Sequence, residues 1–382
     1  MKTPMTTMFN NEFPIFAFSH CRDVVAAVTR AGGVGVLGAV AHSPSALEID
    51  LAWIQDRVDG LPFGVDLIVP AKYAGSETGG MSLGQIRDLI PDAHRAFVED
   101  LMVRYDVPPL PDAETSGGQF GGGSDDKAAP MSAESQAPNL EIALAFDTAL
   151  VVNALGPPPQ HMIERCKEEG RRVGALAGKA QHAERHVNAG VDFIIAQGSE
   201  AGGHTGEIGT MVLIPEIVDA VGSTPVLGAG GIGRGRQMAA AMALGAAGVW
   251  CGSVWLTTEE AETHPTVKQK FLAATSSDTI RSQSRTGKHA RQLQTAWTDE
   301  WENPETPMPL GMPLQPVLVD EAISRINRAA HQKGSGAEQL ANYFVGQIVG
   351  SMNESKPAAR VVLEMVDEFI EATSSLSSQL EF

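Results

Sequence analysis

Short apolar runs alternate with amphipathic stretches along most of the first 257 residues of the chain. Eight of these runs are short enough, and rich enough in Val, Ile, Leu and Ala, to form buried strands. The runs are Phe13–Phe18, Val34–Val40, Phe63–Val69, Ala149–Leu155, Arg172–Ala177, Val191–Gln197, Pro225–Ala229 and Gly248–Gly252. Most of them lead into a stretch with apolar residues at helical spacing. Parallel strands connected by helices are expected, and eight of them predict an α/β fold of the (β/α)8 TIM-barrel type.

The alternation is interrupted between the third and the fourth of these strands. One helix is expected there, over Leu83–Arg104, and it is followed by a stretch rich in Pro, Gly and Ser, Val107–Pro138. This stretch contains too few apolar residues to offset the entropy that ordering it would cost. We therefore expect a flexible insertion over about 105–139, and a lid over a binding site is the alternative for a loop of this length.

A different composition begins after the eighth strand. Residues 258–335 combine basic residues, two tryptophans and many prolines, and they predict a separate substrate lobe over the mouth of the barrel. Within the lobe, a helix is expected over Leu318–Ala330. Residues 336–382 are expected to be mostly helical and to pack back on the barrel, with Tyr343–Gly350 as a close-packing face. The predicted organisation is a barrel over 1–257 with a substrate lobe inserted near its C-terminal end.

The composition is that of a globular protein, since 43% of the 382 residues are hydrophobic and 19% are charged. The net charge of −18 argues against binding to nucleic acid or to an anionic membrane surface. No apolar run is long enough to span a bilayer, and the N-terminus lacks the pattern of a secretory signal. Cys21, Cys166 and Cys251 are scattered without metal-binding spacing, so we expect no metal and a reducing, cytoplasmic location.

Small residues follow the last two predicted strands. The motif GAGGIG, Gly228–Gly233, follows the seventh strand, and Gly252 and Ser253 follow the eighth. In (β/α)8 barrels these two loops are the usual phosphate site, because their backbone N–H groups converge on an anion. The alternative is a Rossmann fingerprint in GAGGIGRG, but it lies late in the chain and lacks the acidic residue expected after the following strand. His204, in the segment GSEAGGHTG after the sixth strand, is the side chain expected beside this site.

Several motifs together resemble the nitronate monooxygenase (2-nitropropane dioxygenase-like) family. They are PIFAF at the first strand, PFGVDL at the third, AQGSEAGGHTG after the sixth, GAGGIG after the seventh and GVWCGS at the eighth, with TGKHAR and YFVGQIVG towards the C-terminus. The resemblance covers nearly the whole chain except Val107–Pro138. It implies an FMN-binding barrel with a substrate lobe, and an enzyme that oxidises alkyl nitronates with O2 to a carbonyl compound and nitrite.

The resemblance also implies a set of FMN contacts on the loops after the strands. The phosphate contacts are Gly230, Gly231, Gly252 and Ser253, and the contacts to the ribityl chain or the ring are Ala17, Phe18, Ser19, Gln197, Gly202 and Gly203. Asp66 stands where the family often has Asn. Asn offers a donor and an acceptor, whereas an ionised Asp only accepts, so this contact differs from the family pattern.

His204 matches the active-site histidine of the family. An unperturbed imidazole titrates at about 6.5, so that at neutral pH it can remove the proton next to a nitro group or hold the resulting anion. The alternative is a histidine that only orders the glycine-rich loop through a hydrogen bond. Lys179, just past the fifth strand, either stabilises negative charge on the flavin pyrimidine or is a solvated lysine at the rim of the barrel.

Two pairs of residues near the expected site have a plain structural interpretation. His20 and Cys21 follow the first strand and are expected at the start of a helix. His182 and His186 are spaced i, i+4, which can bind a metal on a helix face, but no third ligand is in view. Two exposed helix histidines are therefore expected.

The lobe carries a basic cluster of Arg281, Arg285, Lys288 and Arg291. The cluster either contacts an anionic substrate, such as a CoA ester or the phosphates of a nicotinamide cofactor, or pairs with Asp299, Glu300 and Glu302. Trp297 and Trp301 either roof the flavin or pack in the core of the lobe.

Three other functions remain open. The runner-up is an NAD(P)H-dependent flavin reductase of a quinone or an enoyl-thioester, because this scaffold also resembles those enzymes. A flavin-free isomerase or lyase with a phosphate substrate and a non-catalytic flavin-binding protein are the others. The expected partners are a small-molecule substrate with O2, or with NAD(P)H in the reductase, and a homodimer is left open.

Overall fold

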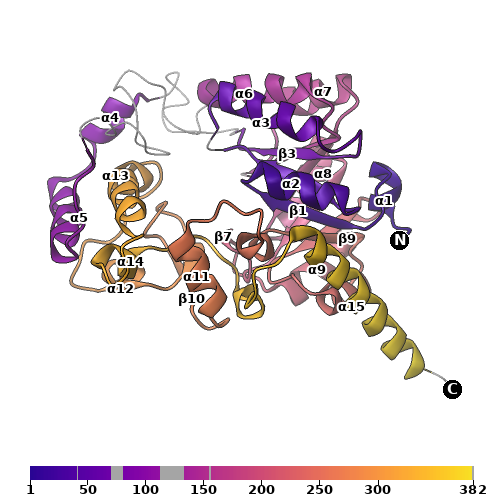
Figure 1. Ribbon diagram of the computed structural model, residues 1–382. Coiled ribbons are helices and arrows are strands. Elements are labelled where there is room, and N and C mark those ends of the chain that lie inside the picture. Colours follow the sequence, from indigo (N-terminus) through magenta and orange to yellow (C-terminus); the bar gives the residue numbers. More distant parts are fainter. Residues whose placement is uncertain (41, 70–80, 112–132, 155, 381–382) are drawn as a thin grey trace.

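The computed structural model describes residues 1–40, 42–69, 81–111, 133–154 and 156–380 of the chain (Figure 1). Eight parallel strands form a closed barrel in the order β1-β2-β3-β4-β5-β6-β8-β9. They are β1 Ile15–Ser19, β2 Val34–Gly38, β3 Gly64–Leu67, β4 Leu150–Asn153, β5 Arg172–Ala177, β6 Phe193–Gln197, β8 Val226–Ala229 and β9 Gly248–Cys251. Each strand lies on one of the eight predicted runs, and most are shorter than the run. The prediction of a (β/α)8 TIM barrel is confirmed.

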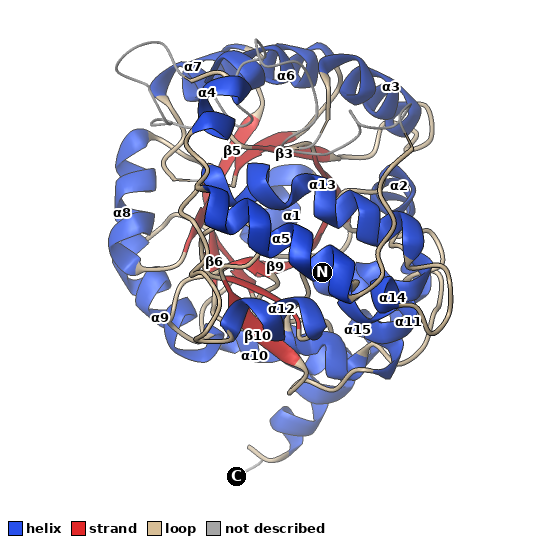
Figure 2. Cartoon of the chain, turned by 90° about the vertical axis from the view of Figure 1, so that its left-hand side faces the viewer, coloured by secondary structure: helices blue, strands red, loops and turns tan. Residues whose placement is uncertain are grey.

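Helices surround the ring of strands (Figure 2). They are α2 Arg22–Arg30, α3 Pro44–Gln55, α6 Ala133–Ala145, α7 Gln160–Glu168, α8 Ala180–Ala189, α9 Thr210–Val221 and α10 Gly235–Ala243. Each buries an apolar face: in α2, for example, Val24, Val25 and Val28 lie on one side and are fully buried. Full burial of a valine side chain stabilises a fold by about 1.5 kcal/mol or more, so the helical spacing read from the sequence has a direct energetic basis.

Helix α6 begins at Ala133, inside the stretch that the sequence predicts to be a loop, so this end of the predicted insertion was wrong. Pro138 lies within the helix. Proline costs about 3 kcal/mol in a helix interior, but Leu140 and Ala143 directly after it are buried in the core between the barrel and its helices. This packing offsets the proline. Residues 105–111 of the predicted insertion are described and bury Val107 in a hydrophobic cluster, whereas 112–132 lies outside the described residues.

The single helix predicted over Leu83–Arg104 is two helices, α4 Leu83–Asp88 and α5 Asp92–Arg104. Pro91 directly precedes α5. Proline disfavours the helical conformation in the residue before it, so the break falls at Ile90.

Helix α1, Pro4–Phe9, closes the end of the barrel that faces away from the lobe (Figure 1). The sequence analysis did not predict it. Phe9 makes edge contacts with Phe16 and Phe193 of the barrel, with ring centroids 5.5 and 5.9 Å apart. Met5 is fully buried in the same cluster. With this end filled by side chains, ligands can reach the barrel only from the carboxyl ends of the strands.

The lobe lies at the carboxyl ends of the strands (Figures 1 and 2). Besides α4 and α5 it contains α11 Pro265–Ala273, α12 Ala296–Glu302, α13 Leu314–Ala329 and α14 Gly336–Leu340. A second hydrophobic cluster forms its core, in which Leu101 and Met102 of α5 join Phe271, Trp297 and Val319. Part of the insertion after the third strand therefore packs with residues far along the chain. The predicted domain boundaries stay a prediction.

A small antiparallel sheet connects the lobe to the barrel. Its strands, in the order β10-β11-β7, are β10 Thr279–Ser282, β11 Ala290–Leu293 and β7 Gly203–His204. Ala290 of β11 lies opposite His204 in this sheet. The sequence analysis did not predict these strands, because TIRS and ARQL lack the alternation of apolar and polar residues that marks a half-buried strand.

Helices α14 and α15 make most of the described part of 336–382 helical, but the chain between them, residues 341–357, contains no α-helix. In this segment, Phe344 forms an isolated antiparallel bridge with Gln292, and a short 3-10 helix, η4 Gln347–Ser351, follows. A second short 3-10 helix, η3 Ser253–Thr257, lies after β9. The extended path brings the backbones together, because a Cβ on Gly346 would lie 2.6 Å from the carbonyl oxygen of Glu200.

Helix α15, Ala358–Ser378, packs on α10 and α2 and then extends away from the barrel (Figure 1). Its contact with α10 is close, since a Cβ on Gly235 would lie 2.0 Å from the carbonyl oxygen of Met365. Arg234 and Arg236 both bind the carboxylate of Glu368 beside this contact. In the part of the chain that the structure describes, no helix is both long and apolar enough to cross a membrane.

Candidate active site

A cavity of about 270 Å³ lies where the carboxyl ends of the strands meet the lobe. Most of the residues predicted for the site line it, namely Phe18, Ser19, Asp66, Gln197, Gly202, Gly203, His204, Gly230, Gly231, Gly252 and Ser253. The lobe adds residues that were not predicted for the site, among them Thr286, Met312, Pro316, Tyr343 and Phe344, although the segments TGKHAR and YFVGQIVG contain three of them. The folded chain thus brings eleven of thirteen predicted positions to one cavity and completes it with the lobe.

Two predicted contacts lie elsewhere. Ala17 is fully buried among residues of the layer between the barrel and its helices, because alternate residues of a strand face opposite sides. Its neighbours Phe16 and Phe18 face the barrel interior instead. Lys179 is exposed at the start of α8 and does not line the cavity, which favours the interpretation of a solvated lysine at the rim.

A larger hollow of about 500 Å³ opens between α10 and α15, away from His204. Several of its charged groups are paired with one another, as Glu368 is with Arg234 and Glu364 is with Lys356. We place the chemistry in the smaller cavity, because only that cavity contains the glycine loops and a histidine.

The two glycines after β8 have the backbone conformation that a phosphate cradle needs. Gly230 and Gly231 have φ values of 101° and 69°, which residues other than glycine rarely adopt. Their loop leads into α10, and Gly252 and Ser253 follow β9 beside it. Successive backbone N–H groups in such conformations form a concave anion site. The cradle and the adjoining apolar cavity therefore fit an FMN phosphate and ring.

Glu200 ties the loop after β6 to this cradle, and the sequence analysis did not single it out. Its carboxylate accepts hydrogen bonds from the backbone N–H of Thr210, at 2.9 Å, and from the Thr210 hydroxyl, also at 2.9 Å. The same hydroxyl also lies 2.9 Å from the carbonyl oxygen of Gly230, so its single proton can be donated to either acceptor. An acid at the start of α9 also interacts favourably with the helix dipole. These contacts hold the segment GSEAGGHTG, which carries His204, against the start of α9 and the loop after β8.

His204 lies on β7 with its side chain in the cavity. Its Nε2 is 2.8 Å from the Thr286 hydroxyl, and its ring centroid is 6.5 Å from that of Phe344. The Thr286 hydroxyl is also 3.2 Å from the carbonyl oxygen of Lys288, to which it can donate. We assign the ring as the donor from Nε2 to Thr286, which leaves Nδ1 with the lone pair that can accept a proton.

Burial, together with a smaller effect of the positive charge of Lys288, lowers the pKa of His204 to about 4. The expectation of an unperturbed imidazole was therefore wrong. The correction does not remove the basic form, since the ring is neutral throughout the physiological pH range. With this lowered pKa, His204 carries no positive charge at neutral pH before FMN binds.

Replacing Thr286 by valine is expected to lower kcat by about two- to tenfold, which corresponds to the net free energy of one hydrogen bond. The reason is that His204 loses the group that fixes its tautomer and ring orientation. Steady-state turnover measures the change, and Thr286→Ser, which keeps the hydroxyl, is the matched control. Equal kcat values for the valine and serine variants would show that the hydroxyl does not orient the ring.

His20 also lines the cavity, although the sequence analysis expected it only at the start of a helix. Its Nδ1 is 2.8 Å from the carbonyl oxygen of Gly38, and burial lowers its pKa. Gly38 leaves room for this ring, because a Cβ there would lie 2.8 Å from the rings of both His20 and Phe18. Cys21 precedes α2 as expected.

The basic cluster of Arg281, Arg285, Lys288 and Arg291 does not pair with Asp299, Glu300 or Glu302. Among the described residues, Glu300 instead binds Arg104 of α5, with two N–O distances of 2.8 and 2.9 Å. Arg281 and Arg291 donate to the carbonyl oxygens of Thr205 and Ser199, so they hold the loop that carries His204. The interpretation as ion pairs within the lobe was therefore wrong.

Two further interpretations from the sequence can be compared with the structure. Trp297 and Trp301 are buried in the core of the lobe and do not line the cavity, as the packing interpretation expected. His186 was expected to be exposed but is buried. Its Nε2 lies 3.1 Å from the carbonyl oxygen of Leu176 in β5. That contact orients His186 inward, away from the face that His182 occupies.

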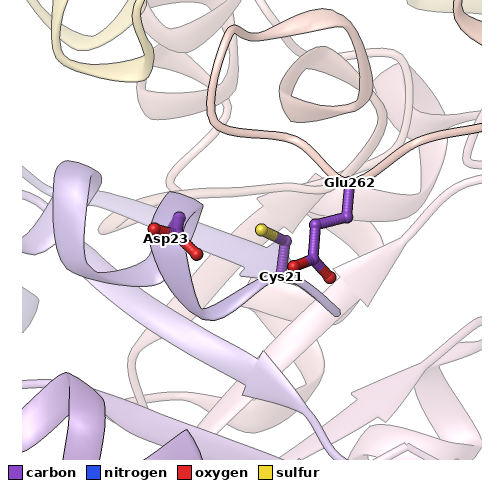
Figure 3. Close-up of side chains that lie close together, drawn as sticks. All are labelled: Cys21, Asp23 and Glu262. Carbon is purple, nitrogen blue, oxygen red and sulfur yellow. The ribbon is translucent and has the colours of Figure 1, made fainter. Parts of the chain in front are cut away.

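Cys21, Asp23 and Glu262 lie close together outside the cavity, with one potential ligand atom from each within 4.8 Å of the others (Figure 3). The Cys21 thiol already donates to the carbonyl oxygen of Glu260 at 3.1 Å. Burial raises the pKa of this thiol. Because metal ions bind the thiolate, both observations disfavour metal binding and we assign no metal to the group.

The family model of nitronate monooxygenase matches residues 2–368 of the chain. A Mycobacterium tuberculosis protein that is named as a monooxygenase is 58% identical over 381 residues, with 100% of both chains covered. A Staphylococcus saprophyticus protein named probable nitronate monooxygenase is 30% identical over 365 residues, with 91% of this chain and 92% of the relative covered.

Two solved structures share the architecture over almost the full length. Nitroalkane oxidase from Streptomyces ansochromogenes has a TM-score of 0.78 at 25% identity, with 97% of this chain and 99% of that chain covered. FabK from Thermotoga maritima has a TM-score of 0.73 at 25% identity, with 100% of both chains covered. The family match and the relatives agree with the motifs on the loops around the cavity. The chain is an oxidoreductase that belongs to the nitronate monooxygenase family.

Proposed function

We propose that the chain is an FMN-dependent nitronate monooxygenase, which oxidises an alkyl nitronate with O2 to a carbonyl compound and nitrite. The observation that carries the proposal is that His204 lines the same cavity as the glycines after β8 and β9. Family membership implies a flavin. The glycine cradle supports FMN as that flavin, because its backbone N–H groups suit a single terminal phosphate.

The residues of the cavity would divide the binding of FMN between them. Gly230, Gly231, Gly252 and Ser253 would hold the phosphate, and the ring would lie among Phe18, Gln197 and the loop Gly202–Gly203. When bound, FMN supplies the electron transfer and the reaction with oxygen. Met312, Tyr343 and Phe344 of the lobe form an apolar wall that excludes water from the reacting groups.

His204 would handle the proton. Nδ1 of the neutral ring accepts the proton from the carbon next to the nitro group when the substrate arrives as a neutral nitroalkane. Thr286 holds the ring through Nε2 while this happens. When the substrate arrives as the nitronate anion, no proton has to be removed, and His204 contributes only contact and orientation.

The pH dependence of turnover is expected to differ from that of an ordinary histidine enzyme. Because burial holds the pKa of His204 at about 4, the neutral, basic form persists at neutral pH. The kcat/KM for a neutral nitroalkane should therefore stay level as the pH falls from 8 to about 5.5 and decline only as it approaches 4. A decline centred near 6.5, absent from His204→Asn, would contradict the lowered pKa.

Anaerobic stopped-flow spectroscopy of the FMN-loaded protein tests the proposal. Mixing with a nitronate alone should change the visible absorption of the flavin, and the same mixture with O2 should release nitrite. A flavin that responds only to NAD(P)H would favour a reductase of a quinone or an enoyl-thioester instead. A purified protein that binds no flavin would contradict both functions.

A further inference from the structure

The carboxyl of Asp66 is a buried acid that faces the cavity. It stands at the end of β3, its side chain lines the cavity, and only 4% of the residue is exposed. The backbone is fixed on both sides, since the carbonyl oxygen of Asp66 accepts from the N–H of Ala39 and β3 pairs with β4. The fixed backbone of β3 therefore keeps the Asp66 side chain on the cavity side of the strand.

No described residue supplies a hydrogen-bond donor or a positive charge to this carboxyl. None of the described residues donates a hydrogen bond to it, and none of the described Lys and Arg residues forms an ion pair with it. Burial alone raises its pKa well above the usual range of an aspartate. Because water no longer solvates the charge and no described group offsets it, an ionised carboxylate is disfavoured here and the neutral acid is favoured.

The other titratable groups of the cavity do not change this conclusion. His20 reaches the cavity from the loop after β1, and its lowered pKa keeps it neutral at neutral pH. His204 is neutral for the same reason, and burial raises the pKa of Tyr343, which keeps the phenol protonated. Of the two strands that pair with β3, β2 ends in Gly38 and β4 ends in Asn153, and neither residue carries a charge.

A neutral carboxylic acid presents one donor and one acceptor side by side, as an asparagine side chain does. The pyrimidine edge of a flavin presents the complement, an N–H between two carbonyl oxygens. An ionised carboxylate could accept from the N–H but would face the carbonyl oxygens with lone pairs only.

We propose that Asp66 binds the flavin ring as a neutral carboxylic acid, and that its ionisation releases the cofactor, so that FMN affinity falls as the pH rises. The proposal rests on the FMN site of the proposed function. The affinity for FMN is highest at any pH at which Asp66 is protonated in the FMN-free protein. Above the pH at which that acid ionises, the Kd for FMN should rise about tenfold for each pH unit, until the acid also ionises in the complex.

The test is the Kd for FMN as a function of pH, measured by quenching of FMN fluorescence, for the parent and for Asp66→Asn. Asn keeps the shape, the donor and the acceptor but cannot ionise. The variant retains His20, His204, Tyr343 and the FMN phosphate, so any titration of those groups is common to both profiles. We expect equal Kd values at low pH and a ratio of Kd values, parent to variant, that rises at least tenfold towards high pH.

A second measurement needs no variant. Infrared difference spectra of the parent, with FMN minus without, should contain a protonated carboxyl band that shifts in D2O, and the band should be absent from Asp66→Asn. Parallel Kd profiles for the parent and the variant, or no carboxyl band, would overturn the proposal while leaving the proposed function intact. No FMN binding at any pH would overturn both.

Discussion

Replacing His204 by asparagine is expected to lower kcat/KM for a neutral nitroalkane by about 10²–10⁴-fold, the usual contribution of a positioned general base. The substitution removes the Nδ1 lone pair that accepts the proton, whereas FMN binding should survive, because the phosphate cradle and Asp66 belong to other segments of the chain. Turnover of the corresponding nitronate should fall much less, since that substrate has already lost its proton. Steady-state oxygen consumption with both forms of one substrate measures the difference.

His289→Asn is the matched control, because His289 is exposed in the same lobe and does not line the cavity. It should turn over both substrates at the parental rate. Equal losses for the nitroalkane and the nitronate in His204→Asn would assign His204 to contact with the substrate rather than to proton removal. Parental rates with full FMN content would leave only the interpretation that His204 orders the glycine-rich loop.

Replacing Gly230 by alanine is expected to raise the Kd for FMN by about tenfold or more, the second large effect. With φ at 101°, a non-glycine residue here stores strain of about 1–3 kcal/mol. The added Cβ would also lie 2.8 Å from the Thr210 hydroxyl and 3.0 Å from the carbonyl oxygen of Gly198, so the cradle must move. Fluorescence titration with FMN measures the affinity, and thermal unfolding without FMN measures the strain.

Gly60→Ala separates the two causes. Gly60 has a φ of 76° in a turn, and a Cβ there would meet nothing within 4 Å. This variant should lose stability through backbone strain and keep its affinity for FMN. If Gly230→Ala lost no more affinity than Gly60→Ala, the loop after β8 would not be the phosphate cradle.

The barrel could be predicted from the sequence because its signals are local. A buried strand such as β4, LVVN, needs a continuous apolar run, and the glycines after β8 are visible at once. Helix α1 also has a local signal in the sequence, namely Thr3 as a capping residue followed by Pro4 in the first turn, although the helix was not predicted.

The lobe side of the cavity could not be predicted in the same way. Thr286, Tyr343 and Phe344 reach the cavity through β11 and the bridge from Phe344 to Gln292, which are contacts between distant segments. Strands as polar as β10 gain their stability from pairing rather than from a periodic pattern. The lowered pKa of His204 likewise depends on the wall that these segments build. The motifs TGKHAR and YFVGQIVG mark Thr286, Tyr343 and Phe344 in the sequence, but they do not show that these residues meet at the cavity.

The shared core of the lobe has a consequence for the order in which the protein folds. Leu101 and Met102 leave the ribosome before five of the eight barrel strands exist, yet their partners Trp297 and Val319 come near the end of synthesis. Until then, the apolar side of α5 has no native surface to cover it, which makes it a natural contact for a chaperone. Contacts of such large sequence separation also slow folding, because the loop between them must close first. We therefore expect closure of the cavity to be the last step in the maturation of this chain.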